Sequence, residues 1–212
     1  MRRAFLAALV GLAASAALPA LAQQTVLTGA ARAQALTQAS AALNAQRSVQ
    51  GRFRQVAPDG TATTGRFYLQ RPGRVRFEYD APSQLLIVSD GQTVAIHDRA
   101  LRSLDRAPLR QTPLYFVLKN NINLDRDARV TRVARDGGAL FVSVRDRTGE
   151  ADGEITLRLE GANMTLRSWE VVDATGSRTR VALTSVDSGG AIDPRLFRTP
   201  RPGALNTTAP AR

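Results

Sequence analysis

Most of this chain alternates between apolar and polar residues, a period of two that predicts short β-strands. Glycine, proline and aspartate interrupt the alternation about every 8–12 residues, which is typical of an antiparallel all-β sandwich or barrel. We therefore expect strands over residues 51–56, 65–71, 74–79, 85–89, 93–98, 128–135, 139–146, 154–160, 165–173 and 177–187.

Two segments, at 30–45 and 112–120, have helical rather than strand character. The first is rich in alanine and predicts a weakly amphipathic helix. In the second, we expect Thr112 as the N-cap and Pro113 at the first helical position. A long sheet normally closes or stacks on another sheet, and both helices can cover the mouth of an open barrel. A curved sheet with such a lid forms a concave apolar pocket, a usual form for hydrophobic-ligand sites.

The strand at 65–71 ends on a charged residue. Side chains alternate between the faces of a strand, so Phe67, Leu69 and Arg71 share one face, and Pro72 then stops the strand. A guanidinium turned toward an apolar interior costs several kcal/mol if it is unpaired, so Arg71 should have carbonyl or carboxylate partners there. The alternative is that Arg71 snorkels from the strand end into water. The spacing alone does not distinguish an inward-pointing Arg71 from one that extends into water.

The same alternation predicts which residues line the pocket. Eight are expected on one concave apolar surface: Phe53, Phe67, Leu69, Val75, Phe77, Tyr79, Ile87 and Val94. A register error of one residue would exchange Ile87 for Leu86. The run at 114–118 is apolar nearly all round, which suits either a lid over the pocket or ordinary core packing. Its candidate lid residues are Leu114, Phe116, Val117 and Leu118.

The N-terminus has the pattern of a secretory signal peptide over residues 1–22. Arg2 and Arg3 precede an apolar run that ends at a small-residue cleavage sequence, and the run is shorter than the roughly 20 residues of a bilayer span. Removing 22 of 212 residues leaves 190, which suits one domain at 23–200 with a disordered tail at 201–212. Because the chain has no cysteine, we expect a soluble exported protein stabilised by its core, without N-terminal lipidation.

The net charge is strongly positive. It is +11 for the whole chain and +9 without Arg2 and Arg3, and Lys119 is the one lysine among 29 basic residues. The arginines are scattered and aromatic residues make up 5% of the chain, whereas nucleic-acid binding needs clustered charge with stacking platforms. Attraction to an anionic lipid surface or an acidic partner fits better.

The sequence offers little for catalysis or metal binding. The single histidine, His97, would have to serve any Ser-His-Asp triad, but no Gly-x-Ser-x-Gly turn is present, so we expect a solvated strand-end residue. The acidic residues at 146–154 lack the spacing of a calcium loop, so we expect a solvated hairpin loop. A pair of carboxylates brought together only by folding stays open as a hydrolase site. We expect no enzyme, metal or cofactor.

Several short motifs occur together in one order: Gly51-Arg52-Phe53-Arg54-Gln55, Gly65-x-Phe67, Arg71-Pro72-Gly73-Arg74-Val75-Arg76-Phe77-Glu78-Tyr79, Pro82, Val88-Ser89-Asp90-Gly91, Thr112-Pro113-Leu114 and Ile192-Asp193-Pro194-Arg195-Leu196-Phe197. Their order and spacing resemble the LolA family, periplasmic carriers of outer-membrane lipoproteins in Gram-negative bacteria, over about residues 30–200. The resemblance implies an unclosed antiparallel β-barrel with a helical lid and lipoprotein acyl chains bound inside. It also implies that Arg71 points inward and bonds lid carbonyls in the closed, empty form, as a latch. The family often has tryptophan in the strand before the arginine; this chain has Tyr68.

The resemblance further implies partners. These are acylated lipoproteins, an inner-membrane complex of the ATP-binding-cassette type that releases them, and an outer-membrane receptor or the outer membrane itself. The protein would be a periplasmic monomer. The alternatives are a related carrier of another lipid or glycolipid, and a lipid-sensing domain of an envelope-stress pathway.

Overall fold

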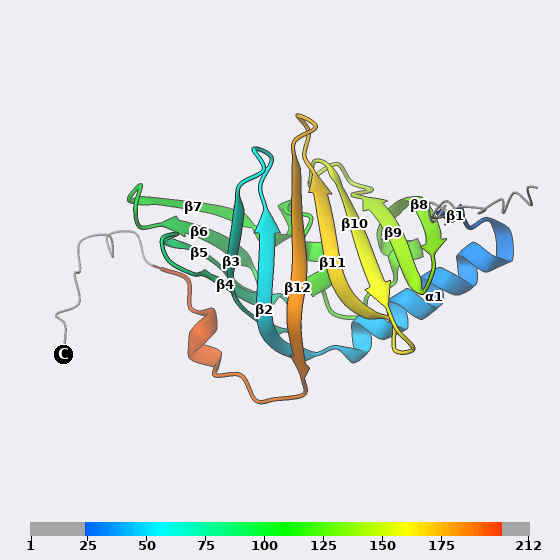
Figure 1. Cartoon of the computed structure of the whole chain (residues 1–212), viewed down its shortest axis with the longest axis horizontal. Coiled ribbons are helices and arrows are strands. Elements are labelled where there is room, and N and C mark those ends of the chain that lie inside the picture. The colour runs from blue at the N-terminus through cyan, green and yellow to red at the C-terminus, as the bar shows by residue number, and fades with distance from the viewer. Residues whose placement is uncertain (1–23, 201–212) are drawn as a thin grey trace, which may run out of the picture.

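The computed structural model describes residues 24–200, nearly half of which form one large antiparallel sheet (Figure 1). Over these residues its twelve strands are β1 (Thr25–Val26), β2 (Ser48–Val56), β3 (Ala62–Gln70), β4 (Arg74–Tyr79), β5 (Leu85–Asp90), β6 (Thr93–Asp98), β7 (Ser103–Pro108), β8 (Arg129–Asp136), β9 (Ala139–Arg145), β10 (Glu154–Glu160), β11 (Thr165–Val172) and β12 (Arg178–Ser188). The predicted signal at 1–22 and tail at 201–212 lie outside the described residues.

The strand order across the sheet is β1-β8-β9-β10-β11-β12-β2-β3-β4-β5-β6-β7. The edge strands β1 and β7 lie at opposite ends of this order, so the sheet curls without closing. This confirms the expected unclosed antiparallel half-barrel. The order also places the last strand, β12, beside β2, so the C-terminal strands extend the face that begins with β2 and β3.

Short helices complete the fold: α1 (Gly29–Ala45), η1 (Leu109–Gln111), α2 (Tyr115–Leu118), α3 (Leu124–Asp127) and η2 (Pro194–Phe197). Helix α1 runs across one face of the sheet (Figure 1). It buries Ala35, Leu36, Ala39 and Leu43, which recur at three- and four-residue spacing and so lie on one side of the helix. This side of α1 and the inner face of the sheet form the main core.

The alternation in the strands explains which face is inner. In β10, Ile155, Leu157 and Leu159 are almost fully buried in the core, while the residues between them point outward. A smaller apolar cluster lies on the outer face, around Leu86 and Val88. Helix η2 packs against β4 and β5 on that side, where the Arg76 side chain donates to the Leu196 carbonyl at 3.0 Å.

Two glycines allow phenylalanine rings to fold over the inner face of β2 and β3. Gly51 pairs with Phe67, and Phe53 pairs with Gly65. A Cβ at Gly65 would lie 2.6 Å from the Phe53 ring and 2.1 Å from the Glu78 carbonyl oxygen, so no larger residue fits without displacing backbone. The repeated Gly-x-Phe spacing thus places each of two phenylalanines opposite a glycine of the neighbouring strand, at the centre of the sheet.

Some local predictions were wrong. Residues 103–108, which are not among the expected strands, form the edge strand β7, where polar residues and a terminal proline are tolerated. Thr112 is not an N-cap, because its hydroxyl donates to the Leu109 carbonyl and α2 begins at Tyr115. His97 is not solvated: it is 7% exposed and lies opposite Leu86 and Leu104 on neighbouring strands.

Candidate functional site

Arg71 follows the last residue of β3 and points inward. Its Nε donates to the Val117 carbonyl of α2 at 3.0 Å, and its Nη1 donates to the carbonyl of Gln46, the C-cap of α1. A single side chain therefore connects the end of β3 to both helical segments that cover the inner face. The prediction that Arg71 contacts lid carbonyls matches this geometry, and the second contact, to α1, was not expected.

The charge of Arg71 is held in an apolar setting. No carboxylate pairs with it among residues 24–200, so two carbonyl dipoles are its main partners. Desolvation by burial lowers the pKa of Arg71 to about 10, which still leaves the guanidinium charged at neutral pH. Burying this charge costs desolvation free energy, which is offset by the hydrogen bonds from Arg71 to the two helical segments.

Arg71 borders a small, partly open cavity between the sheet and α2. Its volume is about 30 Å³, close to the share of one water molecule in the liquid. Apart from Arg71 and Gln46 its lining is apolar: Val49, Phe67, Leu69, Val75, Phe77, Leu114, Val117, Leu118, Leu166, Trp169 and Leu183. In this conformation the cavity is too small for an acyl chain.

The structure brings all eight predicted lining residues into one apolar cluster. Five are buried, while Leu69, Tyr79 and Ile87 are partly exposed and pack against the others. The four predicted lid residues belong to the same cluster, with Phe116, Val117 and Leu118 buried in α2. Ile87 faces this cluster and Leu86 the outer one, so the expected register holds. That these residues contact a ligand stays a prediction.

Sequence reasoning missed the lining contributed by the C-terminal strands. Trp169 and Leu166 of β11 and Leu183 of β12 border the cavity, and the Trp169 ring lies 6.0 Å from that of Phe77. The C-terminal half of the sheet therefore contributes an aromatic ring to the cavity lining. The apolar alternation within 165–173 was the available signal, but only the pairing of β12 with β2 shows that it faces this cavity.

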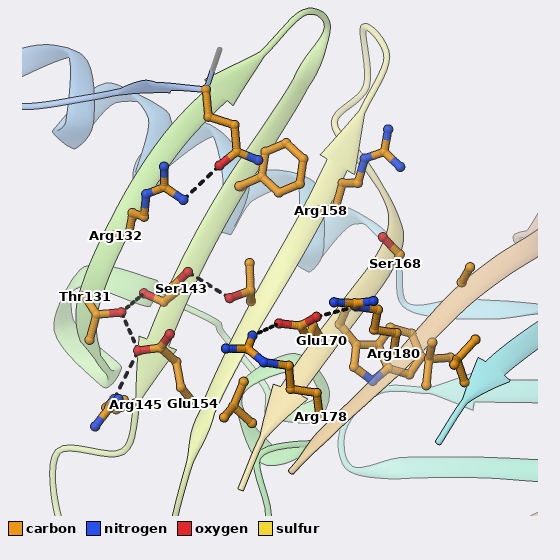
Figure 2. Close-up of a pocket in the computed structure, with 18 of the residues that line it drawn as sticks. Thr131, Arg132, Ser143, Arg145, Glu154, Arg158, Ser168, Glu170, Arg178 and Arg180 are labelled. Carbon is orange, nitrogen blue, oxygen red and sulfur yellow. Dashed lines mark hydrogen bonds and ion pairs between the residues drawn. The ribbon is translucent and has the colours of Figure 1, made fainter. Parts of the chain in front are cut away.

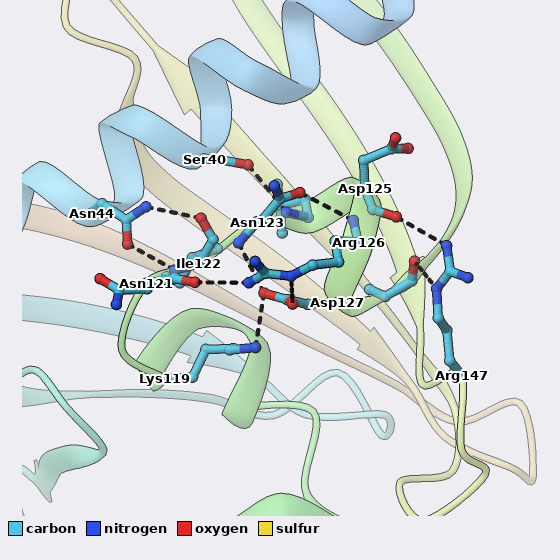
Figure 3. A network of polar contacts seen from close by, with 12 residues as sticks. Ser40, Asn44, Lys119, Asn121, Ile122, Asn123, Asp125, Arg126, Asp127 and Arg147 are labelled. Atoms are coloured by element: carbon cyan, nitrogen blue, oxygen red, sulfur yellow. Dashed lines mark hydrogen bonds and ion pairs between the residues drawn. The ribbon is translucent and has the colours of Figure 1, made fainter.

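A polar network fixes the segment after α2 to α1 (Figure 3). The Asn44 side chain donates to the Ile122 carbonyl and accepts from its N–H, both at 2.8 Å. Lys119 and Asp127 pair at 2.8 Å across the same segment. Burial alone would raise the pKa of Asp127, but hydrogen bonds from Arg126 and Lys119 outweigh it and lower the pKa to about 2. One end of the lid is therefore anchored by a charged carboxylate.

Comparison with known proteins identifies the family. A family model described as outer membrane lipoprotein carrier protein LolA matches residues 44–200, well over half of the chain. The chain belongs to the LolA family. Its relatives include the outer-membrane lipoprotein carrier proteins of Methylibium petroleiphilum, 30% identical over 87% of this chain and 94% of the relative, and of Pseudomonas fluorescens, 29% identical over 74% and 79%.

Among solved structures, a LolA superfamily protein from Nitrosomonas europaea is similar with a TM-score of 0.46 and 11% identity, covering 79% of this chain and 97% of that one. Across residues 24–200 no helix has the length and apolar character needed to cross a membrane. For a LolA family member, the apolar cavity and its arginine are the candidate functional site.

Proposed function

We propose that this LolA family protein carries lipoproteins across the periplasm by enclosing their acyl chains between the inner face of the sheet and the α2 lid. The observation that supports this most is the guanidinium of Arg71, which bonds α1 and α2 at the edge of an otherwise apolar cavity. A purely structural core has no need of a buried charge there, whereas a lid that must open gains a bond that can be broken and reformed.

The cavity volume indicates how loading would proceed. Each acyl CH₂ removed from water contributes about 0.8 kcal/mol, so an anchor with several chains strongly favours an apolar shelter. A cavity of about 30 Å³ must expand to take even one acyl chain. In this proposal it expands when α2, a short helix, moves away from the sheet. Because departure of α2 breaks the Arg71–Val117 bond, the apparent affinity falls with the population of the open form. Release to an acceptor is correspondingly easier.

This mechanism requires a donor and an acceptor. We infer an inner-membrane lipoprotein-releasing complex of the ATP-binding-cassette type as the donor, because loading works against the closed form. The acceptor would be an outer-membrane receptor or the outer membrane itself. In this proposal the protein acts as a non-catalytic periplasmic monomer without cofactor, exported by the signal at 1–22.

Mass spectrometry of molecules that co-purify with the native protein tests the proposal. We expect acylated lipoprotein peptides. A Leu69→Trp variant, which fills the cavity, should lose them, whereas Leu101→Trp adds the same ring at a position 77% exposed and should keep them. Recovery of a glycolipid or phospholipid instead would identify a different cargo. If nothing co-purifies with the wild type or with either variant, the result would argue against a carrier.

A further inference from the structure

The outer face of the sheet carries a second hollow, on the side opposite α1 (Figure 2). It has a volume of about 890 Å³ and is formed by strands β8 to β12 and β2. Six arginines and two glutamates line it, a net charge of +4. The cavity under the lid contains one arginine in an apolar lining, so the two sites differ in chemistry as well as in position.

Strand register explains why this face is hollowed. Arg158 of β10 pairs with Ser168 of β11, Ser168 pairs with Ala182 of β12, and Ala182 pairs with Arg54 of β2. Two small side chains therefore lie in one row between two arginines. Three strand spacings separate the arginine backbones by about 14 Å. A group resting on Ser168 and Ala182 would be about 7 Å from each arginine backbone, within reach of both side chains.

The glutamates neutralise only part of this charge. Glu170 accepts from Arg178 at 2.7 Å and also from Arg180, and Glu154 accepts from Arg145 at 3.0 Å. These contacts do not involve Arg54 or Arg158, which flank Ser168 and Ala182 in what we call the upper row of the hollow.

That upper row has spare donors. Arg158 pairs with Glu160 beside the hollow, and its guanidinium lies 5.8 Å from the centre of the Phe141 ring. The Arg54 side chain makes no ion pair or hydrogen bond with any of the residues the structure describes. The N–H donors of Arg54 are therefore available to a bound anion.

We propose that this outer hollow binds a phosphate ester over Ser168 and Ala182, with Arg54 and Arg158 donating from either side. Guanidinium forks match phosphate oxygens in pairs, and these charge-assisted bonds are about twice as strong as neutral ones. The Ser168 hydroxyl is the additional donor at the floor. The row spans the width of a single anionic group, which favours a phosphate ester over the broad surface of an acidic protein.

The phosphate ester can come from an anionic phospholipid headgroup or from a soluble metabolite. Two probes separate these sources: glycerol phosphate in solution, and vesicles of phosphatidylcholine with or without phosphatidylglycerol. Binding of the mixed vesicles identifies a lipid headgroup as the source, and binding of glycerol phosphate alone identifies a soluble ester. Either result supports the site, provided that the hollow's own residues are needed.

Variants of the full chain test that requirement. Each lost arginine should weaken binding about fivefold, the equivalent of about 1 kcal/mol per basic residue at an anionic surface. The pair Arg54→Gln with Arg158→Gln should therefore bind about 25-fold more weakly. Ala182→Leu, which fills the bottom of the hollow without changing its charge, should also weaken binding. The control pair is Arg99→Gln with Arg110→Gln, two exposed arginines outside the hollow, and it should bind as the wild type does.

Two results would overturn the proposal: the control pair loses as much affinity as the hollow pair, or neither probe binds, including the case in which the hollow variants still slow cargo transfer. That last case would assign this face to an acidic protein instead. Thermal melting of each variant checks that it is folded. Because the hollow and the lidded cavity lie on opposite faces, loss of phosphate binding with normal acyl-chain loading separates this proposal from the carrier function.

Discussion

Replacing Arg71 with leucine should weaken the closed, empty form of the carrier. The change removes two hydrogen bonds from a charged group, to the carbonyls of Val117 and Gln46, each worth about 1.5–3 kcal/mol. It also removes the free-energy cost of burying the guanidinium. Burial lowers the pKa of Arg71 from 12.5 to about 10, which corresponds to a cost of about 3 kcal/mol. The closed form should therefore lose up to about 3 kcal/mol, and because departure of α2 breaks the Val117 bond alone, roughly 100-fold is the upper limit of the change in its population.

The assay is transfer of a purified acylated lipoprotein from loaded carrier to acceptor vesicles. Arg71→Leu should accept cargo more readily and deliver it more slowly, because less is regained when the emptied lid closes. Arg71→Lys should have a milder effect, since it keeps the charge but loses the planar fork. Arg74→Leu, a change at an exposed arginine that bonds Gln70, is the matched control. Delivery by Arg71→Leu at the wild-type rate would refute the latch.

Three further predictions concern charge and burial. The pKa of Asp127 is about 2 in the folded protein and about 3.9 in the unfolded chain. The ionised carboxylate therefore stabilises the fold by about 1–2 kcal/mol above pH 4, and this stabilisation is lost as the pH falls toward 2. Asp127→Asn should melt at a lower temperature than the wild type at neutral pH and at the same temperature near pH 2. Neither ring nitrogen of buried His97 has a partner in the described residues, so His97→Leu should raise the unfolding free energy by about 1–2 kcal/mol, and a lower melting temperature would contradict this. With a net charge of +9 on the chain without residues 1–22, transfer to a membrane partner should slow as salt rises, and rates independent of salt would exclude steering by charge.

The alternation of the sequence predicted those parts of the fold in which one strand face is buried. The bounds of β10 agree with the expected 154–160, and Phe67, Val75 and Phe77 face the core as expected. A slip of one residue would turn each apolar side chain outward, so burial of a single face fixes the register. This is also why Ile87, and not Leu86, faces the main cluster.

Features that depend on nonlocal pairing could not be read from the pattern. Trp169 borders the cavity because β12 pairs with β2, and nothing in either segment specifies that neighbour. The contact of Arg71 with Gln46 uses a backbone carbonyl, which any residue type supplies. His97 is buried between apolar residues of adjacent strands, and its polar side chain gave no sign of that environment.

The choice of arginine at the cavity edge follows from the balance of these terms. An apolar residue at position 71 would pack against α2 in the closed form and against acyl chains in the loaded form, so it would distinguish little between them. Arg71 instead makes its bond to Val117 only when α2 is in place, while its bond to Gln46 holds the end of α1. The cost of burying its charge cancels most of the gain from these bonds. The closed form is then favoured by a small margin. A carrier that must both load and release needs such a margin, because a strongly preferred closed form would exclude cargo and a preformed open cavity would retain it.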